Sequence, residues 1–287
     1  MNTLAIDIGG TKFTIALFED DGRRMTLRES RQTDRAGGRA WMLGQIEEIA
    51  RRWQSDVPIG RCAVGFGGPV DFARQTVALS THVGGWQDFP LVEHLRQLLG
   101  VPTVMDNDAN VGALGEAACG AGRGCRPLFY MTLSTGIGGG FILDGGQVYR
   151  GADCWAGEIG HLTIEPNGPE CLCGARGCLE RMCSGLWLER DFGRPAKELM
   201  QDAAFVERYA VHLAQGLKAA VMLLNPARIV IGGGIAKAGD ALFVPLRREL
   251  KRQMTAWSQA RLDVVPAQLG DDSVLWGALI LADMVLA

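Results

Sequence analysis

A cluster of potential metal ligands lies near the middle of the chain, within 18 residues: His161, Cys171, Cys173 and Cys178. Thiolates and a neutral imidazole are the ligands that Zn2+ takes in closed, four-coordinate protein sites. Gly174 and Gly177 lie between the thiols, and glycine lets the backbone turn sharply enough for three sulfur atoms to converge. The spacing therefore predicts a structural zinc site.

Two other interpretations of this cluster are disulfide bonds and chance clustering in a chain with eight cysteines. The dense spacing and the histidine favour zinc over both. We expect the scattered thiols to be small core residues. They are Cys62, Cys119, Cys125, Cys154 and Cys183.

Two carboxylates, Glu158 and Glu180, flank the metal segment. An ion that already has four protein ligands does not need them. We therefore expect the metal to hold a loop rigid while these two acids face a polar ligand. In this interpretation the metal builds a binding site and takes no part in the chemistry.

The first residues predict a strand over 4–8, a glycine turn and a second strand over 13–17. Gly9 and Gly10 can bring backbone N–H groups against phosphate oxygens, and Thr11 and Lys12 add donors. Asp7, at the strand end, is suited to hold Mg2+. An ordinary hairpin turn is the alternative. A further turn is expected at Asp20-Asp21-Gly22.

A polar run, Asp106-Asn107-Asp108-Ala109-Asn110, follows a predicted strand over 101–105 and opens a helix. In open α/β sheets, ligands bind beyond the carboxyl ends of strands, so these side chains are well placed for a site. Simple helix capping would need only one of them. An aspartate here could take the proton of a substrate hydroxyl during phosphoryl transfer.

The strand–turn–strand pattern recurs at residues 128–149, with the turn predicted over Ser134–Gly140. This repeat suggests two similar halves that each offer a phosphate-binding turn. Three glycines, 232–234, follow a predicted strand over 228–231, where a flat ring such as adenine could lie on bare backbone. Tight turning is the competing interpretation. Helices are expected over 40–53, 92–98, 203–224, 242–254 and from 273 onward.

The 287 residues carry a net charge of −3, which gives no electrostatic footprint for nucleic acid or an anionic membrane. No apolar run reaches transmembrane length, and the chain starts directly with a strand. With 47% hydrophobic residues and 39 glycines, we expect a cytoplasmic α/β protein.

Together these motifs resemble those of the ROK family (repressors, open reading frames and sugar kinases), over essentially the whole chain. The matching segments are Asp7–Thr11, Gly65–Val70, Asn107–Asn110, Ser134–Gly140, Glu158–His161 and Cys171–Glu180. The resemblance implies two RNase H-like domains of the actin-like ATPase fold that flank a cleft. It also implies a small domain, residues 1–113 plus 275–287, and a large domain, residues 114–274, with the zinc loop.

For the site, the resemblance implies that Asp108 is the catalytic base. It implies sugar contacts from Gly68, Asn107, Asp108, Glu158, His161 and Glu180. It implies contacts to ATP and its Mg2+ from Asp7, Gly9, Gly10, Thr11, Lys12, Thr135, Gly136, Gly233 and Gly234. His161 would then serve zinc through one ring nitrogen and the sugar through the other.

The function that the resemblance implies is an ATP-dependent hexose kinase, with glucokinase favoured. Trp86 before Asp88-Phe89-Pro90 supports glucose. The same enzyme acting on N-acetylmannosamine, N-acetylglucosamine, fructose or allose is the main alternative. A sugar-responsive repressor is less favoured, because only six residues precede Asp7 and we expect no DNA-binding module. The resemblance also implies a homodimer.

Overall fold

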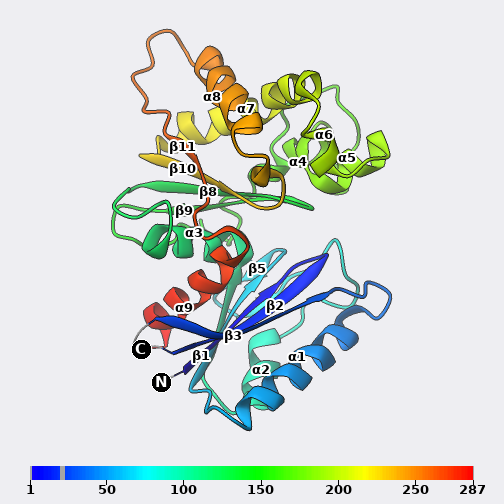
Figure 1. The fold of residues 1–287 in the computed structure, drawn as a ribbon, viewed down its shortest axis with the longest axis vertical. Coiled ribbons are helices and arrows are strands. Elements are labelled where there is room, and N and C mark those ends of the chain that lie inside the picture. The colour runs from blue at the N-terminus through cyan, green and yellow to red at the C-terminus, as the bar shows by residue number, and fades with distance from the viewer. Residues whose placement is uncertain (1, 20–22, 287) are drawn as a thin grey trace. The chain divides into compact units, whose positions relative to one another are not determined.

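The computed structural model describes residues 2–19 and 23–286, and these form two compact units (Figure 1). Unit 1 comprises Met1–Ala118, Arg150–Trp155 and Asp272–Ala287. Unit 2 comprises Cys119–Tyr149 and Ala156–Asp271. The turn predicted at Asp20-Asp21-Gly22 lies outside the described residues. None of the described helices is both long enough and apolar enough to cross a membrane.

Unit 1 is built on a five-stranded mixed sheet in the order β3-β2-β1-β4-β7. The strands are β1 (Asn2–Ile8), β2 (Lys12–Glu19), β3 (Arg24–Gln32), β4 (Arg61–Phe66) and β7 (Thr103–Asn107). β1 pairs antiparallel with β2 and parallel with β4, and β4 pairs parallel with β7. The parallel strands are buried along nearly their whole length, whereas the edge strand β3 alternates between half-buried and exposed residues.

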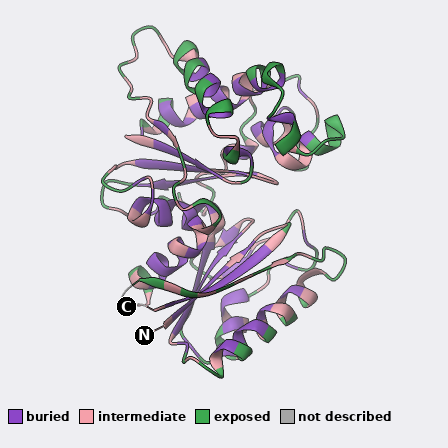
Figure 2. Cartoon of the chain, in the orientation of Figure 1, coloured by how far each residue is buried: buried purple, intermediate pink, exposed green. Residues whose placement is uncertain are grey.

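Helices pack on the sheet of unit 1 as the apolar spacing predicts. α1 (Gly38–Gln54) and α2 (Leu91–Leu99) bury Met42, Ile46 and Leu95 in one core with strands β1, β2 and β4. Their outer faces are exposed (Figure 2). α9 (Ser273–Val285) packs against β1 and β4, and its Trp276 contacts Phe18 edge to face with ring centroids 5.0 Å apart.

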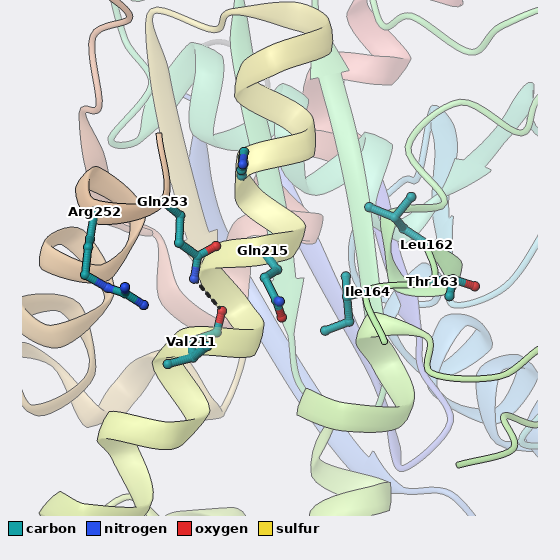
Figure 3. A pocket seen from close by; sticks show the side chains of 8 residues that line it. Leu162, Thr163, Ile164, Val211, Gln215, Arg252 and Gln253 are labelled. Carbon is teal, nitrogen blue, oxygen red and sulfur yellow. Dashed lines mark hydrogen bonds between the residues drawn. The ribbon is translucent and has the colours of Figure 1, made fainter. Parts of the chain in front are cut away.

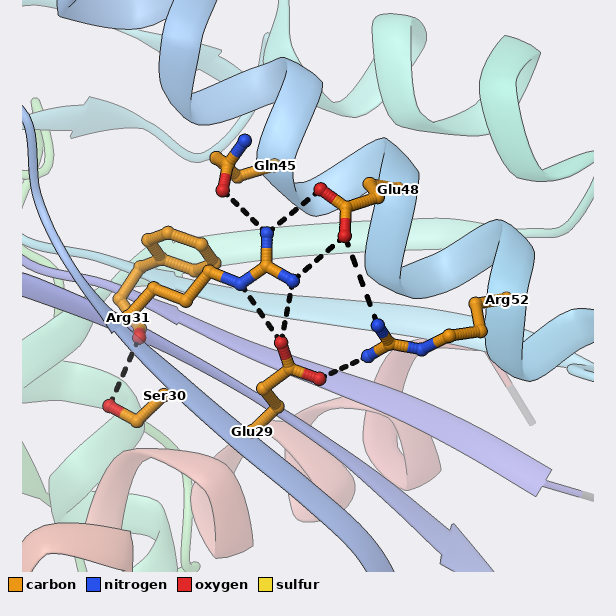
Figure 4. A network of polar contacts seen from close by, with 7 residues as sticks. Glu29, Ser30, Arg31, Gln45, Glu48 and Arg52 are labelled. Carbon is orange, nitrogen blue, oxygen red and sulfur yellow. Dashed lines mark hydrogen bonds and ion pairs between the residues drawn. The ribbon is translucent and has the colours of Figure 1, made fainter.

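A polar network ties the edge strand β3 to α1 (Figure 4). The guanidinium of Arg31 makes two hydrogen bonds of 2.9 Å to the carboxylate oxygens of Glu48. It also bonds Glu29 at 2.9 Å and the side chain of Gln45. Arg52 pairs with Glu29 from the next turn of the helix. These contacts hold the polar side of β3 against α1 without apolar packing.

α3 (Asp108–Cys119) and α9 cross at two glycines that leave no room for side chains. A Cβ atom at Gly115 would lie 2.1 Å from the carbonyl oxygen of Ser273, and one at Gly277 would lie 1.7 Å from that of Val111. Close to this crossing, the hydroxyl of Ser273 donates a 2.7 Å hydrogen bond to Glu116, and both side chains are buried. The crossing fixes the helix that begins at Asp108.

Unit 2 repeats the strand arrangement of unit 1, as the internal duplication predicts. Its sheet has the order β11-β10-β8-β9. The strands are β8 (Leu128–Leu133), β9 (Ile137–Ile142), β10 (Arg228–Gly232) and β11 (Val264–Pro266). β8 pairs antiparallel with β9 and parallel with β10, which in turn pairs parallel with β11. This matches β1 with β2, β4 and β7.

The glycine turn of unit 2 is shorter than the sequence predicts. Residues 138–140, expected in the turn, belong to β9 and pair with residues 130–132 of β8. The turn itself is only Ser134–Gly136. The end of β9 pairs with residues 147–149, through the bridge between Ile142 and Val148.

The long helices of unit 2 follow the predicted spans. α7 (Ala203–Leu224) and α8 (Asp240–Gln253) pack on the sheet around Leu213, Leu217 and Leu246. Three short helices were not predicted: α4 (Leu179–Cys183), α5 (Gly185–Phe192) and α6 (Ala196–Leu199). Each is too short for helical periodicity to be visible in the sequence.

The scattered thiols are only partly core residues. Cys62 and Cys183 are fully buried, as expected. Cys119, Cys125 and Cys154 are half-buried, so for these three the core prediction is wrong. None of the eight cysteines, all of which lie in the described part of the chain, forms a disulfide bond.

Candidate functional site

The carboxylate of Asp108 lies at the carboxyl ends of the parallel strands of unit 1. β7 ends at Asn107 and α3 begins at Asp108, so the residue is held at a strand–helix junction. A Cβ atom at Gly67 would lie 3.3 Å from Asp108 Oδ2 and 3.5 Å from the Cα atom of Gly9. The structure thus brings Asp108 beside the first glycine turn, although about 100 residues separate them in the sequence.

Asn107 and Asp108 cap the helix that follows them. Asp108 Oδ1 and Asn107 Oδ1 both accept from the backbone N–H of Ala109, at 2.8 and 2.9 Å. The side-chain amide of Asn107 donates a 3.1 Å bond to the carbonyl oxygen of Gly68. The capping interpretation is therefore correct, and the capping bonds fix the Asp108 carboxylate in one orientation.

The first glycine turn is tight, and hydrogen bonds within it and from Thr33 hold it in place. The N–H of Gly9 donates to the carbonyl oxygen of Lys12 at 3.0 Å, and Thr33 donates to that of Thr11 at 2.8 Å. A Cβ atom at Gly10 would lie 2.7 Å from the Cβ of His82, so only glycine fits there. No pattern in the sequence indicates that His82 packs on this turn. Asp7 precedes the turn on β1, beside Gly65 of β4.

The second turn caps a helix of unit 2. The N–H of Ser134 donates to the carbonyl oxygen of Gly136 at 3.0 Å and closes the turn. The carbonyl oxygens of Ser134 and Thr135 accept from Gly185 and Leu186, at 2.7 and 3.1 Å, where α5 begins. The turn is therefore held rigidly against the segment that follows the predicted metal loop.

Glu158, His161 and Glu180 come together in unit 2. The short 3-10 helix η2 (Ile159–His161) packs directly on β9. A Cβ atom at Gly160 would lie only 2.2 Å from the carbonyl oxygen of Ile137. Glu180 Oε2 accepts a 2.8 Å hydrogen bond from the N–H of Ile137. Burial raises the pKa of Glu158, His161 opposes that shift and Glu180 adds to it.

The ligand atoms of His161, Cys171, Cys173 and Cys178 lie within 4.8 Å of one another. The sulfur atoms of Cys173 and Cys178 are 3.6 Å apart, close to the separation expected across a tetrahedral ion with metal–sulfur bonds of about 2.3 Å. The buried Nδ1 atom of His161 has no hydrogen-bond partner. A group of this composition and spacing fits a metal ion.

The thiols of this cluster differ in acidity. Burial raises the pKa of Cys178 to about 12 and also raises that of Cys171. For Cys173, burial works in the same direction, but hydrogen bonds from Ala175 and from the other two thiols lower its pKa overall. Metal binding therefore has to displace protons from at least the two more buried thiols.

The glycines of the metal loop have the role that the sequence predicts. Gly174 and Gly177 adopt positive φ angles of 90° and 60°. A Cβ atom at Gly177 would lie 1.6 Å from the carbonyl oxygen of Glu165, so no other residue fits. Gly177 accepts hydrogen bonds from Ile164 and Glu165, which closes the loop around the cluster.

The glycines after β10 are not equivalent. Gly233 has a φ of +89°, and a Cβ atom there would lie 2.4 Å from the carbonyl oxygen of Leu133. Gly234 is exposed and has nothing within 4 Å of its Cβ position. Tight packing accounts for Gly233, whereas Gly234 leaves its surface open to a ligand.

One ion pair of a buried aspartate with a half-buried arginine, close to Asp108, was not predicted. Asp106 is 1% exposed, and its Oδ2 accepts from Arg150 Nε at 2.8 Å and from Nη2 at 2.7 Å. The guanidinium of Arg150 stacks on Phe72, 3.7 Å from the ring centroid. No local pattern could signal a pair separated by 44 positions in the sequence.

A separate pocket of about 450 Å3 lies on unit 2 (Figure 3). It opens between α7, α8 and the strand-like segment that follows His161. Its polar lining includes Gln215, Lys218, Arg252 and Gln253. None of the predicted site residues lines it.

Two mixed sheets of matching strand order, each with a glycine turn between its first two strands, define the actin-like ATPase fold with two RNase H-like domains. The chain belongs to the ROK family, whose model matches residues 3–285. The chain is 31% identical to a glucokinase of Thermotoga maritima, over 97% of this chain and 96% of the relative. It is also 31% identical to an N-acetylmannosamine kinase of Citrobacter koseri, over 98% and 99%.

The chain is also similar to a solved structure of a ROK family glucokinase. The ROK family glucokinase of Streptomyces griseus, determined in complex with glucose and AMPPNP, superposes with a TM-score of 0.88. It is 28% identical to this chain, and the match covers 99% of this chain and 100% of that one.

Proposed function

We propose that this chain is an ATP-dependent hexose kinase that transfers the γ-phosphoryl group of ATP to the 6-hydroxyl of glucose. The observation that carries the proposal is the position of the Asp108 carboxylate beside Gly67 and Gly9, at the carboxyl ends of β1, β4 and β7. A base held next to a phosphate-binding turn is the arrangement that phosphoryl transfer to a hydroxyl needs. The glucokinase relatives support the choice of reaction.

Asp108 is the proposed base, which accepts the proton of the attacking hydroxyl. The remaining sugar contacts are proposed for Gly68, Asn107, Glu158, His161 and Glu180. Phosphoryl transfer needs little covalent help, so these residues serve mainly to align the hydroxyl with the phosphorus atom. The capping bonds that hold Asn107 and Asp108 support this role, because they fix the base before substrate binds.

The nucleotide is proposed to bind the two glycine turns and the loop after β10. Gly9, Gly10, Thr11 and Lys12, with Thr135 and Gly136, would contact the phosphates, and Gly233 and Gly234 the adenosine. Asp7 is the proposed partner of Mg2+. The open surface of Gly234 and the tight, well-supported turn at Gly9 are consistent with these roles.

The metal is proposed to be Zn2+, bound by His161, Cys171, Cys173 and Cys178. Four protein ligands complete its coordination, so it supplies no open position for chemistry. Its role is to fix the ring of His161 and the loop between Glu158 and Glu180. The buried, unpartnered Nδ1 atom of His161 supports ligation through that nitrogen.

A panel of hexoses with ATP, followed by ADP release, tests the proposal. Glucose is expected to have the highest kcat/KM, at least about tenfold above N-acetylmannosamine, N-acetylglucosamine, fructose and allose. N-acetylmannosamine is the second candidate substrate, because a kinase for that sugar is equally similar in sequence. A higher kcat/KM for any of these sugars than for glucose would replace the assigned substrate, and no turnover with any would refute the kinase.

We also propose that two copies form a homodimer in the cytoplasm, where ATP is available and thiols stay reduced. Light scattering of the purified protein tests the first part: a mass near 62 kDa supports a dimer and one near 30.9 kDa refutes it. The net charge of −3 favours neither nucleic acid nor an anionic membrane as a partner.

A further inference from the structure

Arg150 lies at an unusual point of the chain. It immediately follows Tyr149, where the first segment of unit 2 ends, and it opens the six-residue segment Arg150–Trp155 that belongs to unit 1. Its guanidinium is 22% exposed and lies between the ring of Phe72 and the carboxylate of Asp106. The chain therefore enters unit 1 at a residue that binds the end of β7.

The carboxylate bound by Arg150 holds both sides of Asp108. Asp106 Oδ1 accepts from the backbone N–H of Asn107 at 2.7 Å and from the side-chain amide of Asn110 at 3.1 Å. Asn107 precedes Asp108 and Asn110 lies in the first turn of α3. One buried carboxylate thus ties the last residue of β7 to the first turn of the helix, with Asp108 between them.

Arg150 is the cation that favours the ionised form of this carboxyl group. Asp106 is almost completely buried, and burial raises its pKa. Arg150 opposes that effect, as do the bonds from Asn107 and Asn110. A neutral carboxyl group would accept the bonds from Asn107 and Asn110 more weakly than the ionised one, because hydrogen bonds to a charged acceptor are the stronger ones. Loss of Arg150 would therefore weaken the bonds on both sides of Asp108.

We propose that Arg150 is a positioning residue for catalysis, which acts through Asp106 to hold the β7–α3 junction and orient the Asp108 carboxylate. It contacts neither substrate nor the reacting atoms in this assignment. The catalytic part of the inference rests on the proposed kinase function, whereas the structural part does not. Since a displacement of about 1 Å can cost about 100-fold in rate, a loosened junction is expected to lower kcat more than substrate affinity.

The test compares Arg150→Met with Arg150→Lys in steady-state assays with ATP and glucose. Arg150→Met is expected to lower kcat by about 10- to 100-fold, with both KM values within about threefold of wild type. Arg150→Lys keeps a cation and is expected to recover most of kcat. Asp106→Asn combined with Arg150→Met is expected to be no slower than the slower single variant, because both changes break one linkage.

Arg61 offers a matched control. It too is an arginine of unit 1 paired with an aspartate, Asp283, but it stands at the first residue of β4, the end opposite the glycine turns. Arg61→Met is expected to lower the melting temperature while kcat stays within about twofold of wild type. If the two arginine variants lose kcat equally at equal loss of stability, Arg150 is merely structural and the proposal is wrong.

Amide hydrogen exchange separates this inference from the kinase assignment. Peptides covering residues 106–112 are expected to exchange faster in Arg150→Met than in wild type, and at the wild-type rate in Arg61→Met. Unchanged exchange there in Arg150→Met overturns the positioning role. If the wild-type protein phosphorylated no hexose, the proposed function would fail, yet the exchange result would still decide whether Arg150 holds the junction.

Discussion

Glu180 accepts a 2.8 Å hydrogen bond from the backbone N–H of Ile137, so its carboxylate is tied to the first residue of β9. Glu180 lies two residues after Cys178, a proposed zinc ligand, and Ile137 directly follows the turn Ser134–Gly136. A single bond therefore connects the metal segment with the end of a proposed phosphate turn. We therefore expect that loosening the loop around the proposed zinc site weakens sugar binding before the protein unfolds.

Metal removal tests that connection. The purified protein is expected to contain about one Zn2+ per chain, and Cys173→Ser is expected to lose it. Chelation should raise the KM for glucose by about 10- to 100-fold while the protein stays folded by circular dichroism, because Glu158 and Glu180 lose their fixed positions.

The matched variant for the metal experiment is Cys119→Ser, which changes a half-buried thiol outside the cluster. It is expected to keep its zinc and its KM. An absence of bound metal from the wild-type protein would contradict the zinc assignment. Unchanged glucose affinity in a zinc-free, folded preparation would contradict the link between the metal and the sugar contacts.

Replacing the proposed base gives the most direct test of the reaction. Asp108→Asn keeps a capping side chain, so the fold and glucose binding should persist. Because the amide cannot accept the proton, kcat is expected to fall by about 100- to 10,000-fold. Calorimetry of glucose binding and steady-state kinetics measure the two effects. Asp56→Asn, at an exposed position after α1, should leave kcat unchanged. A near-normal kcat in Asp108→Asn would show that the base is another group.

Substitutions at Gly233 and Gly234 can distinguish a role in packing from a role in nucleotide binding. Gly233→Ala places a methyl group 2.4 Å from the carbonyl oxygen of Leu133 at a positive φ, and is expected to destabilise the protein by roughly 1–3 kcal/mol. Gly234→Ala has open space and should leave the melting temperature unchanged. If the adenosine lies on this backbone, Gly234→Ala is expected to raise the KM for ATP severalfold. An unchanged KM would exclude Gly234 from the nucleotide site.

The network between β3 and α1 predicts a pH-dependent stability. The hydrogen bond from Arg31 lowers the pKa of Glu48 below its ordinary value of 4.5. A carboxyl group with a lowered folded pKa stabilises the protein fully above its unfolded pKa, and this contribution is lost as pH falls through the folded pKa. Glu48→Gln is therefore expected to lower the melting temperature at pH 7.

That difference should shrink as the pH falls from the ordinary pKa of 4.5 through the lowered pKa of the folded state, where the wild-type carboxylate takes up a proton as well. Glu47→Gln is a suitable control, since Glu47 lies one position earlier on α1 and pairs with Arg51 of the same helix instead of with β3. Thermal melts of the three proteins at pH 7 and pH 3 measure the effect. A difference that is the same at both pH values would rule out the ion pair as its cause.

The features that the sequence predicted correctly depend on local spacing or on a general rule of α/β sheets. The side chains of His161, Cys171, Cys173 and Cys178 come together because glycines turn the chain within a short segment. Asp108 lies beside Gly9 because parallel strands end at one edge of a sheet. Both arguments need only residue types and the order of elements.

The features that were missed depend on contacts between distant segments. Glycines 138–140 look like a turn in the sequence, yet they pair with β8 as a strand. At Gly139 a Cβ atom would lie 2.7 Å from the ring of Phe129 and 2.8 Å from the carbonyl oxygen of Gly157, so close packing explains this glycine. Arg150 and Asp106 meet only after β7 and the segment Arg150–Trp155 have been placed in one unit. No periodicity or motif carries such information, so only the folded structure reveals it.

The position of α9 at the end of the sequence has a consequence for biosynthesis. Residues 272–287, which complete unit 1, leave the ribosome after every residue of unit 2. Until then the nascent sheet of β1, β4 and β7 lacks the helix that covers one of its faces, and its apolar strands stay open to aggregation. Unit 2 is complete earlier, so during translation the second half of this chain can fold before the first.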